Sequence, residues 1–131
     1  MNSKLKFLFL SLLMGFSLVS FSQQVEDIKL NPEKVKKFTP YMEWKHGGPQ
    51  GFEAWKSTNK MQYAKEMWYY SESFYVKRNH LATGVTLDES IIDISRFENQ
   101  RSKTDEVIVT LPGYKDVLVL LPENKLIYKL N

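Results

Sequence analysis

The sequence predicts an α+β protein, in which an aromatic-rich helical N-terminal half packs on a C-terminal three-stranded antiparallel β-meander. Three observations predict this class. Apolar residues recur at helical spacing between Lys60 and Arg78. After residue 105, short aliphatic and β-branched runs alternate with proline-containing turns, a pattern typical of strands. Most aromatic residues fall in the helical half, where bulky side chains can supply a core.

The N-terminus has the order of a secretory signal peptide. A basic head precedes an almost unbroken apolar run from Phe7 to Phe21, and small residues lead up to Ser22. The run is shorter than the roughly 20 residues that span a bilayer. We therefore expect residues 1–22 to be cleaved between Ser22 and Gln23. Export would then leave one small globular domain, residues 23–131, in the periplasm or outside the cell.

Composition limits the classes of function. The chain has 18 Lys and Arg against 15 Asp and Glu, and two of the lysines leave with the leader, so the domain is nearly neutral. A nucleic-acid partner, which needs a basic patch, is not expected. The chain has no cysteine, so its fold relies on the core alone. No second long apolar segment follows the leader, so no membrane span is expected in the mature chain.

The first helix is predicted to begin after Asn31, which serves as N-cap, with Pro32 at the first helical position. The Thr39-Pro40 pair is predicted to stop this helix near Phe38, because proline disrupts a helix interior. A short turn through Trp44 can follow it.

The segment from His46 to Gly51 is the strongest break in the sequence, with three glycines and one proline. It predicts a sharp turn into a short helix from Phe52 to Ser57. Its His-Gly-Gly start is comparable to an esterase oxyanion loop. However, the chain has no Gly-x-Ser-x-Gly nucleophile motif and no cysteine nucleophile, which disfavours esterase chemistry.

The segment from Lys60 to Arg78 is predicted to form one amphipathic helix. Its apolar arc gathers most of the large side chains, namely Tyr63, Ala64, Met67, Trp68, Tyr70, Ser71, Phe74 and Tyr75. Tyr69 and Val76 fall together on the opposite, polar side. We therefore expect Tyr69 to be exposed.

The next segment is predicted to form a helix from Thr86 to about Glu98, since Thr86 and Glu89 match a capping box. Its expected buried side carries Ile91, Ile94 and Phe97. The polar and apolar residues of 91–97 also alternate in part, so a strand over 91–97 is the alternative interpretation.

The three C-terminal runs, residues 106–111, 116–121 and 125–130, are predicted to form the meander. The middle run is apolar on both faces, as expected of a covered strand. One face is covered by the helices. The other, expected to carry Ile108, Leu118, Leu120 and Ile127, would need a further cover, which a second copy of the chain could supply.

The aromatic cluster carries the functional prediction. The side chains proposed to bind a ligand are Trp44, His46, Trp55 and Tyr69, because aromatic faces with polar tips stack on sugars or anchor peptide side chains. The chain is therefore interpreted as a non-enzymatic module of the cell envelope that binds a protein or a glycan. No catalytic residue, cofactor or metal site is assigned, since two histidines cannot complete a three-histidine zinc site.

Two alternatives remain open at this stage. A small hydrolase acting on envelope polymers would use carboxylates between Asp88 and Asp93 with His46 or His80 as acid and base. A purely structural homodimer would instead form through the second sheet face.

Overall fold

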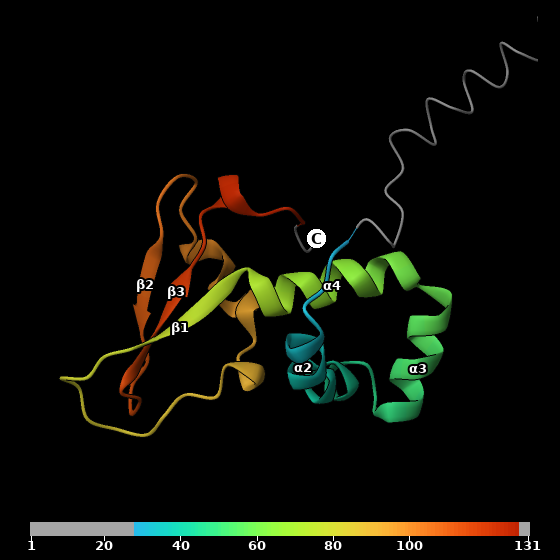
Figure 1. The fold of residues 1–131 in the computed structure, drawn as a ribbon, viewed down its shortest axis with the longest axis horizontal. Coiled ribbons are helices and arrows are strands. Elements are labelled where there is room, and N and C mark those ends of the chain that lie inside the picture. The colour runs from blue at the N-terminus through green and yellow to red at the C-terminus, as the bar shows by residue number, and fades with distance from the viewer. Residues whose placement is uncertain (1–27, 129–131) are drawn as a thin grey trace, which may run out of the picture.

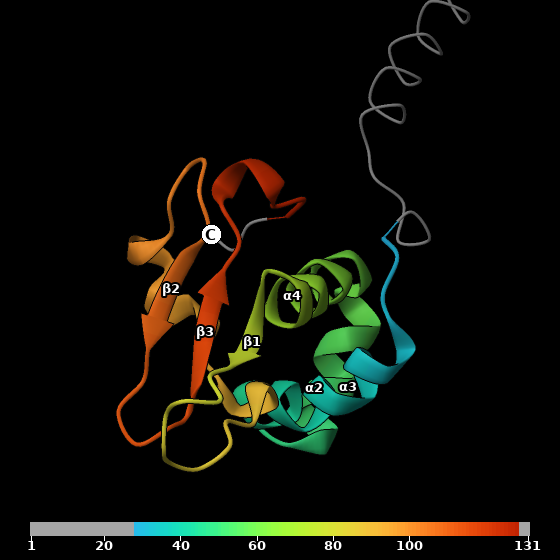
Figure 2. The ribbon, with the colours of Figure 1, turned by 60° about the vertical axis from the view of Figure 1, so that its left-hand side comes forward.

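The computed structural model describes residues 28–128. Within this range the helices α2 (Pro32–Lys45), α3 (Pro49–Thr58) and α4 (Lys60–Glu72) lie to one side of a three-stranded antiparallel sheet (Figures 1 and 2). The predicted α+β class, with an aromatic-rich helical half and a three-stranded antiparallel sheet, is confirmed. The leader predicted at residues 1–22 lies outside the described residues.

Helix α2 begins as predicted but does not end at Phe38. The Asn31 side chain accepts hydrogen bonds from the backbone N–H groups of Glu33 and Lys34. Pro40 lies inside the helix, which continues to Lys45, so the predicted stop is wrong. The buried residues Phe38, Tyr41 and Met42 lie on both sides of the proline, and their packing against the core outweighs the missing backbone hydrogen bond.

The glycine segment turns the chain from α2 into α3, as predicted. Gly47 and Gly48 adopt φ angles of 87° and 101°, a region that residues with a side chain rarely occupy. The following helix is longer than the predicted Phe52–Ser57, since Pro49 provides its first turn. Phe52 is buried and anchors α3 on the core.

Helix α4 ends at Glu72 instead of Arg78. The Ser73 hydroxyl donates to the carbonyl oxygen of Tyr69 at 2.6 Å, which satisfies a carbonyl of the last turn. Strand β1 (Phe74–Arg78) follows at once and pairs with β3. Pairing with a distant strand has therefore overridden the helical periodicity of the C-terminal third of this segment.

Tyr69 is fully buried, which contradicts its predicted exposure. Most of the predicted apolar arc of α4 is buried as expected, but the helix is enclosed on the side of Tyr69 as well. There the guanidinium Cζ of Arg101 lies 5.7 Å from the centre of the Tyr69 ring. Arg101 is itself buried; it donates to the carbonyl oxygens of Ser73 and Leu121 and pairs with Glu98.

The segment from residue 86 to 101 is neither a regular α-helix nor a strand. It forms two 3-10 helices, η2 (Glu89–Ile91) and η3 (Ile94–Gln100). Asp88 and Asp93 are the N-caps, and each accepts from the serine two residues further on. These local bonds compete with a continuous helix.

The burial of this segment matches the prediction only in part. Ile94 is buried and Phe97 packs against the core, as predicted. Ile91 is exposed, which contradicts the prediction. Its position at the end of η2 turns its side chain away from the core, toward the surface beside α2.

The strand order of the sheet is β1-β3-β2, with β2 (Val107–Thr110) and β3 (Asp116–Leu120) forming a hairpin. Two of the predicted runs, 106–111 and 116–121, are confirmed as strands. The third strand is β1 and not residues 125–130, because Lys125 ends the short helix η4 (Glu123–Lys125) and residues 126–128 are not in a strand.

The central strand is covered on both faces, as its apolar sequence predicts. Leu118 and Leu120 join the core below the helices, so their predicted place on the outer face is wrong. The outer face instead carries Val119 between Tyr75 and Ile108. Val119 is almost completely buried, because its cross-strand neighbours cover it. This face is therefore covered in part by its own sheet.

Candidate functional site

The structure does not bring the four residues predicted to bind a ligand into one site. Trp44 is 73% exposed on α2, the highest exposure among the described tryptophans. His46 and Trp55 stack on each other with ring centres 3.8 Å apart. Tyr69 is enclosed in the core and does not reach the surface. Only Trp44 therefore presents a large free aromatic face, although the assignment of a ligand to these residues remains a prediction.

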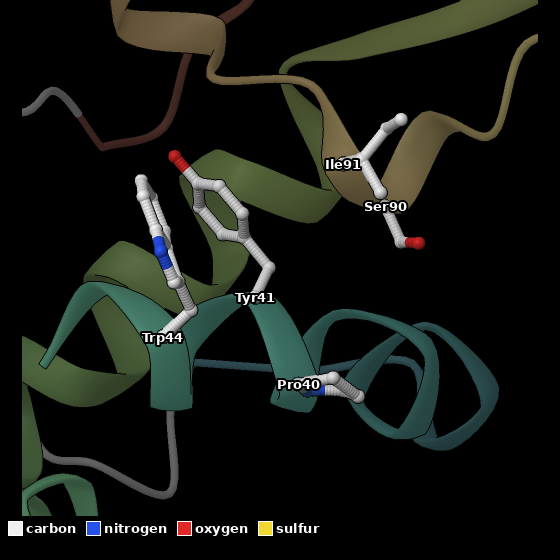
Figure 3. A pocket seen from close by; sticks show the side chains of 5 residues that line it. All are labelled: Pro40, Tyr41, Trp44, Ser90 and Ile91. Carbon is white, nitrogen blue, oxygen red and sulfur yellow. The ribbon is translucent and has the colours of Figure 1, made fainter. Parts of the chain in front are cut away.

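Trp44 borders a cleft of about 340 Å³. The cleft is lined by residues of two segments that are far apart in the sequence, namely Pro40, Tyr41, Trp44, Ser90 and Ile91. Figure 3 shows the rings of Tyr41 and Trp44 rising side by side from α2, while Ser90 and Ile91 come from the neighbouring segment. The two ring centres are 5.7 Å apart. The far wall is formed by Ile91, which is 63% exposed.

Local sequence explains how the two walls are placed. Tyr41 and Trp44 are three residues apart, so they lie on one face of α2. The Asp88 cap forms η2 and thereby sets the positions of Ser90 and Ile91. An ion pair of 2.9 Å between Lys37 and Glu89 connects α2 to η2 near the cleft.

One residue that lines the cleft, Tyr41, has a buried hydroxyl group. Tyr41 is more than nine-tenths buried, and its Oη has no hydrogen-bond partner. Burial, together with the nearby Tyr70 hydroxyl and Asp93 carboxylate, raises the pKa of Tyr41 far above its usual value. The hydroxyl therefore stays protonated, and because it is buried it is not available to a ligand in the cleft.

Opposite charges lie near Tyr41 and Tyr70. Partial burial acts to raise the pKa of Asp93, but the hydroxyl and backbone N–H of Ser95 and the charge of Lys45 outweigh it, so the pKa is lowered. The Lys45 ammonium lies 5.1 Å from the centre of the Tyr70 ring. One carboxylate and one cation therefore lie near the two tyrosines, and neither belongs to the cleft lining.

His46 and Trp55 belong to a second aromatic group, at the corner of α2 and α3. The His46 Nε2 atom lies 3.2 Å from the Glu66 carboxylate, and both side chains are largely buried. Phe52 lies beneath this pair, with its ring centre 6.1 Å from His46. The arrangement holds the glycine turn against α4, so a structural role accounts for both residues.

The residues named for a hydrolase are not brought together. Asp88 and Asp93 cap their 3-10 helices, and hydrogen bonds from Ser90 hold the pKa of Asp88 below its usual value. A general acid needs a raised pKa at neutral pH. In the part of the chain that the structure describes, neither His46 nor His80 forms a hydrogen bond or ion pair with these two carboxylates.

The comparisons with known proteins add no assignment: no family model, curated protein or solved structure matches this chain. Between residues 28 and 128, no cluster of three or more His, Asp or Glu side chains is arranged to hold a metal ion. Over the same residues, no helix has both the length and the apolar character needed to cross a membrane.

The sequence identified Trp44 but missed the residues that complete the cleft. Pro40 was interpreted as a helix stop and Ile91 as a core residue, so neither was considered for a surface site. The three-residue spacing of Tyr41 and Trp44 was the available signal. It becomes informative only once α2 is known to continue through Pro40.

Proposed function

We propose that this chain is an exported, non-enzymatic binding module that contacts a protein partner through the cleft beside Trp44. One observation carries the proposal: Trp44 is 73% exposed next to a cleft whose far wall is Ile91, itself 63% exposed. Two large apolar side chains that stay exposed beside one cleft contribute little to folding stability. A partner that fills the cleft would bury both of them.

The magnitude is that of a small interaction hot spot. A tryptophan buries about 150–250 Å², so covering most of Trp44 yields on the order of 3 kcal/mol at roughly 25 cal/mol per Å². Ile91 adds about 1–2 kcal/mol. Since association also costs entropy, the cleft alone supports weak binding, and residues around it would have to supply the rest of a micromolar affinity.

The lining favours an apolar side chain of a protein over a sugar. A sugar stacked on Trp44 would need polar groups around its hydroxyls. The Ser90 hydroxyl already donates to Asp88 at 2.6 Å, and the Tyr41 hydroxyl is buried. The cleft is thus poor in free polar groups, as expected of a pocket that receives an aliphatic or aromatic anchor residue.

Export is the second part of the proposal and rests on the sequence alone. Residues 1–22 carry the basic head, apolar run and small-residue exit of a signal peptide. Mass analysis of the N-terminus of the natively expressed protein tests this part. A mature chain starting at Gln23 supports it, and a product that retains Met1 to Ser22 contradicts it.

Binding is best tested by probing the wild-type chain with a peptide array and a glycan array. Trp44→Ala and Ile91→Ser remove the two walls, while Ile127→Ala is a matched control, because Ile127 is 65% exposed and does not line the cleft. We expect peptides with a large apolar residue to bind the wild type and the control. Both cleft variants should bind them at least tenfold more weakly.

Three outcomes would contradict the proposal. Equal binding by all four proteins would exclude the cleft as the binding site. If the wild type binds nothing on either array, the proposed binding function is wrong. The third outcome is that the wild type binds a glycan and no peptide, and that Trp44→Ala no longer binds the glycan. The site would then be correct, but its partner would be a glycan instead of a protein.

A further inference from the structure

Two loops meet at one end of the sheet, away from the cleft. The segment after β1, residues 79–86, lies beside the β2–β3 turn, residues 111–115, and both extend beyond the strands (Figures 1 and 2). Asn79 N–H donates to the carbonyl oxygen of Lys115, and Val85 forms an isolated bridge with Tyr114. We call these residues the loop end.

The loop end presents an apolar tip. Leu81 is 95% exposed and Val85 is 63% exposed. The tip has a defined shape, because the Asn79 side chain accepts from Leu81 N–H and the Asn79 carbonyl accepts from Ala82 N–H. Gly84 has a φ of 138°, and a Cβ there would lie 2.6 Å from the Gly113 oxygen, so the two loops are closely fitted. Leu81 is thus held outward by hydrogen-bonded backbone.

Basic residues lie in the two segments that form this tip, with Lys77 and Arg78 exposed and Lys115 partly exposed. Lys77 and Arg78 end strand β1, and Lys115 closes the adjacent turn. Neither 77–86 nor 111–115 contains an acidic residue. The nearest carboxylate in the sheet, Asp116, is only 2% exposed and already accepts from Leu87 N–H. Arg78 lies 3.7 Å from it, with about half of its side chain exposed.

We propose that the loop end docks on an anionic lipid bilayer surface, with Leu81 and Val85 entering the interface and Lys77, Arg78 and Lys115 contacting the headgroups. An apolar protrusion flanked by cations matches such a surface in both chemistry and charge. The tip protrudes, whereas an apolar anchor for a protein partner would need a matching hollow in that partner. A nucleic acid would bury Leu81 only by unstacking its bases, at a cost of a few kcal/mol per step.

The expected attachment is weak and depends on salt. Burying one leucine in the bilayer interface strengthens partitioning of the protein onto the vesicle by roughly 30-fold. Each cation near an anionic surface strengthens this partitioning by roughly fivefold. The cationic part falls as salt screens the surface. Attachment through the loop end is therefore reversible, and it is distinct from the protein binding proposed for the cleft.

The absence of cysteine allows a site-specific test. The full chain carrying Leu81→Cys or, as a control, Ile127→Cys is labelled with a polarity-sensitive fluorophore and mixed with phosphatidylglycerol–phosphatidylcholine vesicles. We expect blue-shifted emission for the label at 81 and none for the label at 127. Pure phosphatidylcholine vesicles should give at least a tenfold weaker response. Any binding through the apolar leader would leave the label at 81 in water, so it is distinguished from the proposal.

A second measurement uses unlabelled protein. The measurement is co-sedimentation with vesicles. Lys77→Glu combined with Lys115→Glu should weaken binding to anionic vesicles at least tenfold relative to Lys77→Arg, a control that keeps the positive charge. The proposal is overturned if the label at 81 never leaves water, or if both labels shift equally. It is also overturned if the label at 81 is shielded only when envelope proteins are added, since the tip then docks on protein.

Discussion

Replacing Tyr69 by phenylalanine should stabilise the fold. The Tyr69 side chain is fully buried and its hydroxyl has no hydrogen-bond partner. A buried polar group without a partner costs about 1–3 kcal/mol. Phenylalanine removes the hydroxyl and keeps the ring against which Arg101 lies at 5.7 Å. The void left by one oxygen atom offsets part of the gain, so we expect a net increase of about 1 kcal/mol in the free energy of unfolding.

Urea denaturation measures this change directly. The midpoint should move to higher urea concentration with an unchanged m-value, and Tm should rise by roughly 4–8 °C. Tyr75→Phe is a matched control. The Tyr75 hydroxyl donates to Glu106 at 3.2 Å on the exposed outer face of the sheet, so its loss should lower the stability by at most about 0.5 kcal/mol. A lower midpoint for Tyr69→Phe would refute the reasoning and show that its hydroxyl is hydrogen-bonded in solution.

Three further predictions concern other parts of the fold. In thermal melts, Trp44→Ala should change stability by less than about 0.5 kcal/mol because Trp44 is exposed, whereas Trp55→Ala should cost about 1–3 kcal/mol because the indole is stacked and partly buried; equal losses would contradict the assigned exposures. The pKa of Asp93 is lowered below 3.8 in the fold, so the stability from its carboxylate is present above that pH and lost as pH falls through the folded pKa. Asp93→Asn should therefore be less stable than wild type in melts at pH 7, and the gap should close as the pH falls below 3.8 through the folded pKa; a gap that widens on acidification would show the wrong sign. Arg101→Met should lower the unfolding free energy in urea by about 2–3 kcal/mol, because backbone carbonyls lose a charged donor; a loss below about 1 kcal/mol would mean that desolvation of the guanidinium offsets its hydrogen bonds.

Local signals in the sequence predicted the features that depend on neighbouring residues. The Asn31 cap, the glycine turn after His46 and the two aliphatic strands 106–111 and 116–121 all follow from residue types at short spacing. The structure confirms each of them. They are the cases in which local preference and tertiary packing agree.

The errors occur where a distant partner decides the outcome. Residues 74–78 have helical periodicity, yet they pair with a strand that lies about 40 residues further along the chain. Tyr69 falls on the polar side of its helix, yet Arg101 encloses it. Asp88 and Asp93 each accept hydrogen bonds from the backbone N–H and the hydroxyl of the serine two residues further on. These local bonds interrupt the expected helix. Periodicity within one segment contains no information about such contacts.

The candidate site also combines a feature that the local sequence indicates with features that depend on distant contacts. The sequence indicates Trp44 as a ligand-binding candidate, because it lies beside the glycine turn. The cleft could not, since its far wall comes from Ile91, which reaches α2 only through the fold of η2. The sequence does not indicate the loop end either, because Lys77 and Lys115 are far apart in it and reach the same end of the sheet only through the pairing of β1 with β3.

The order of the strands has a consequence for how the chain matures. The central strand, Asp116–Leu120, is made last but must pair on both sides, with β2 nearby and with β1 far back in the sequence. The β2–β3 hairpin can close quickly, whereas β1 must wait for a long loop to close. Until then a strongly apolar strand shows an open edge, which invites self-association. We therefore expect refolding yield to fall steeply with protein concentration.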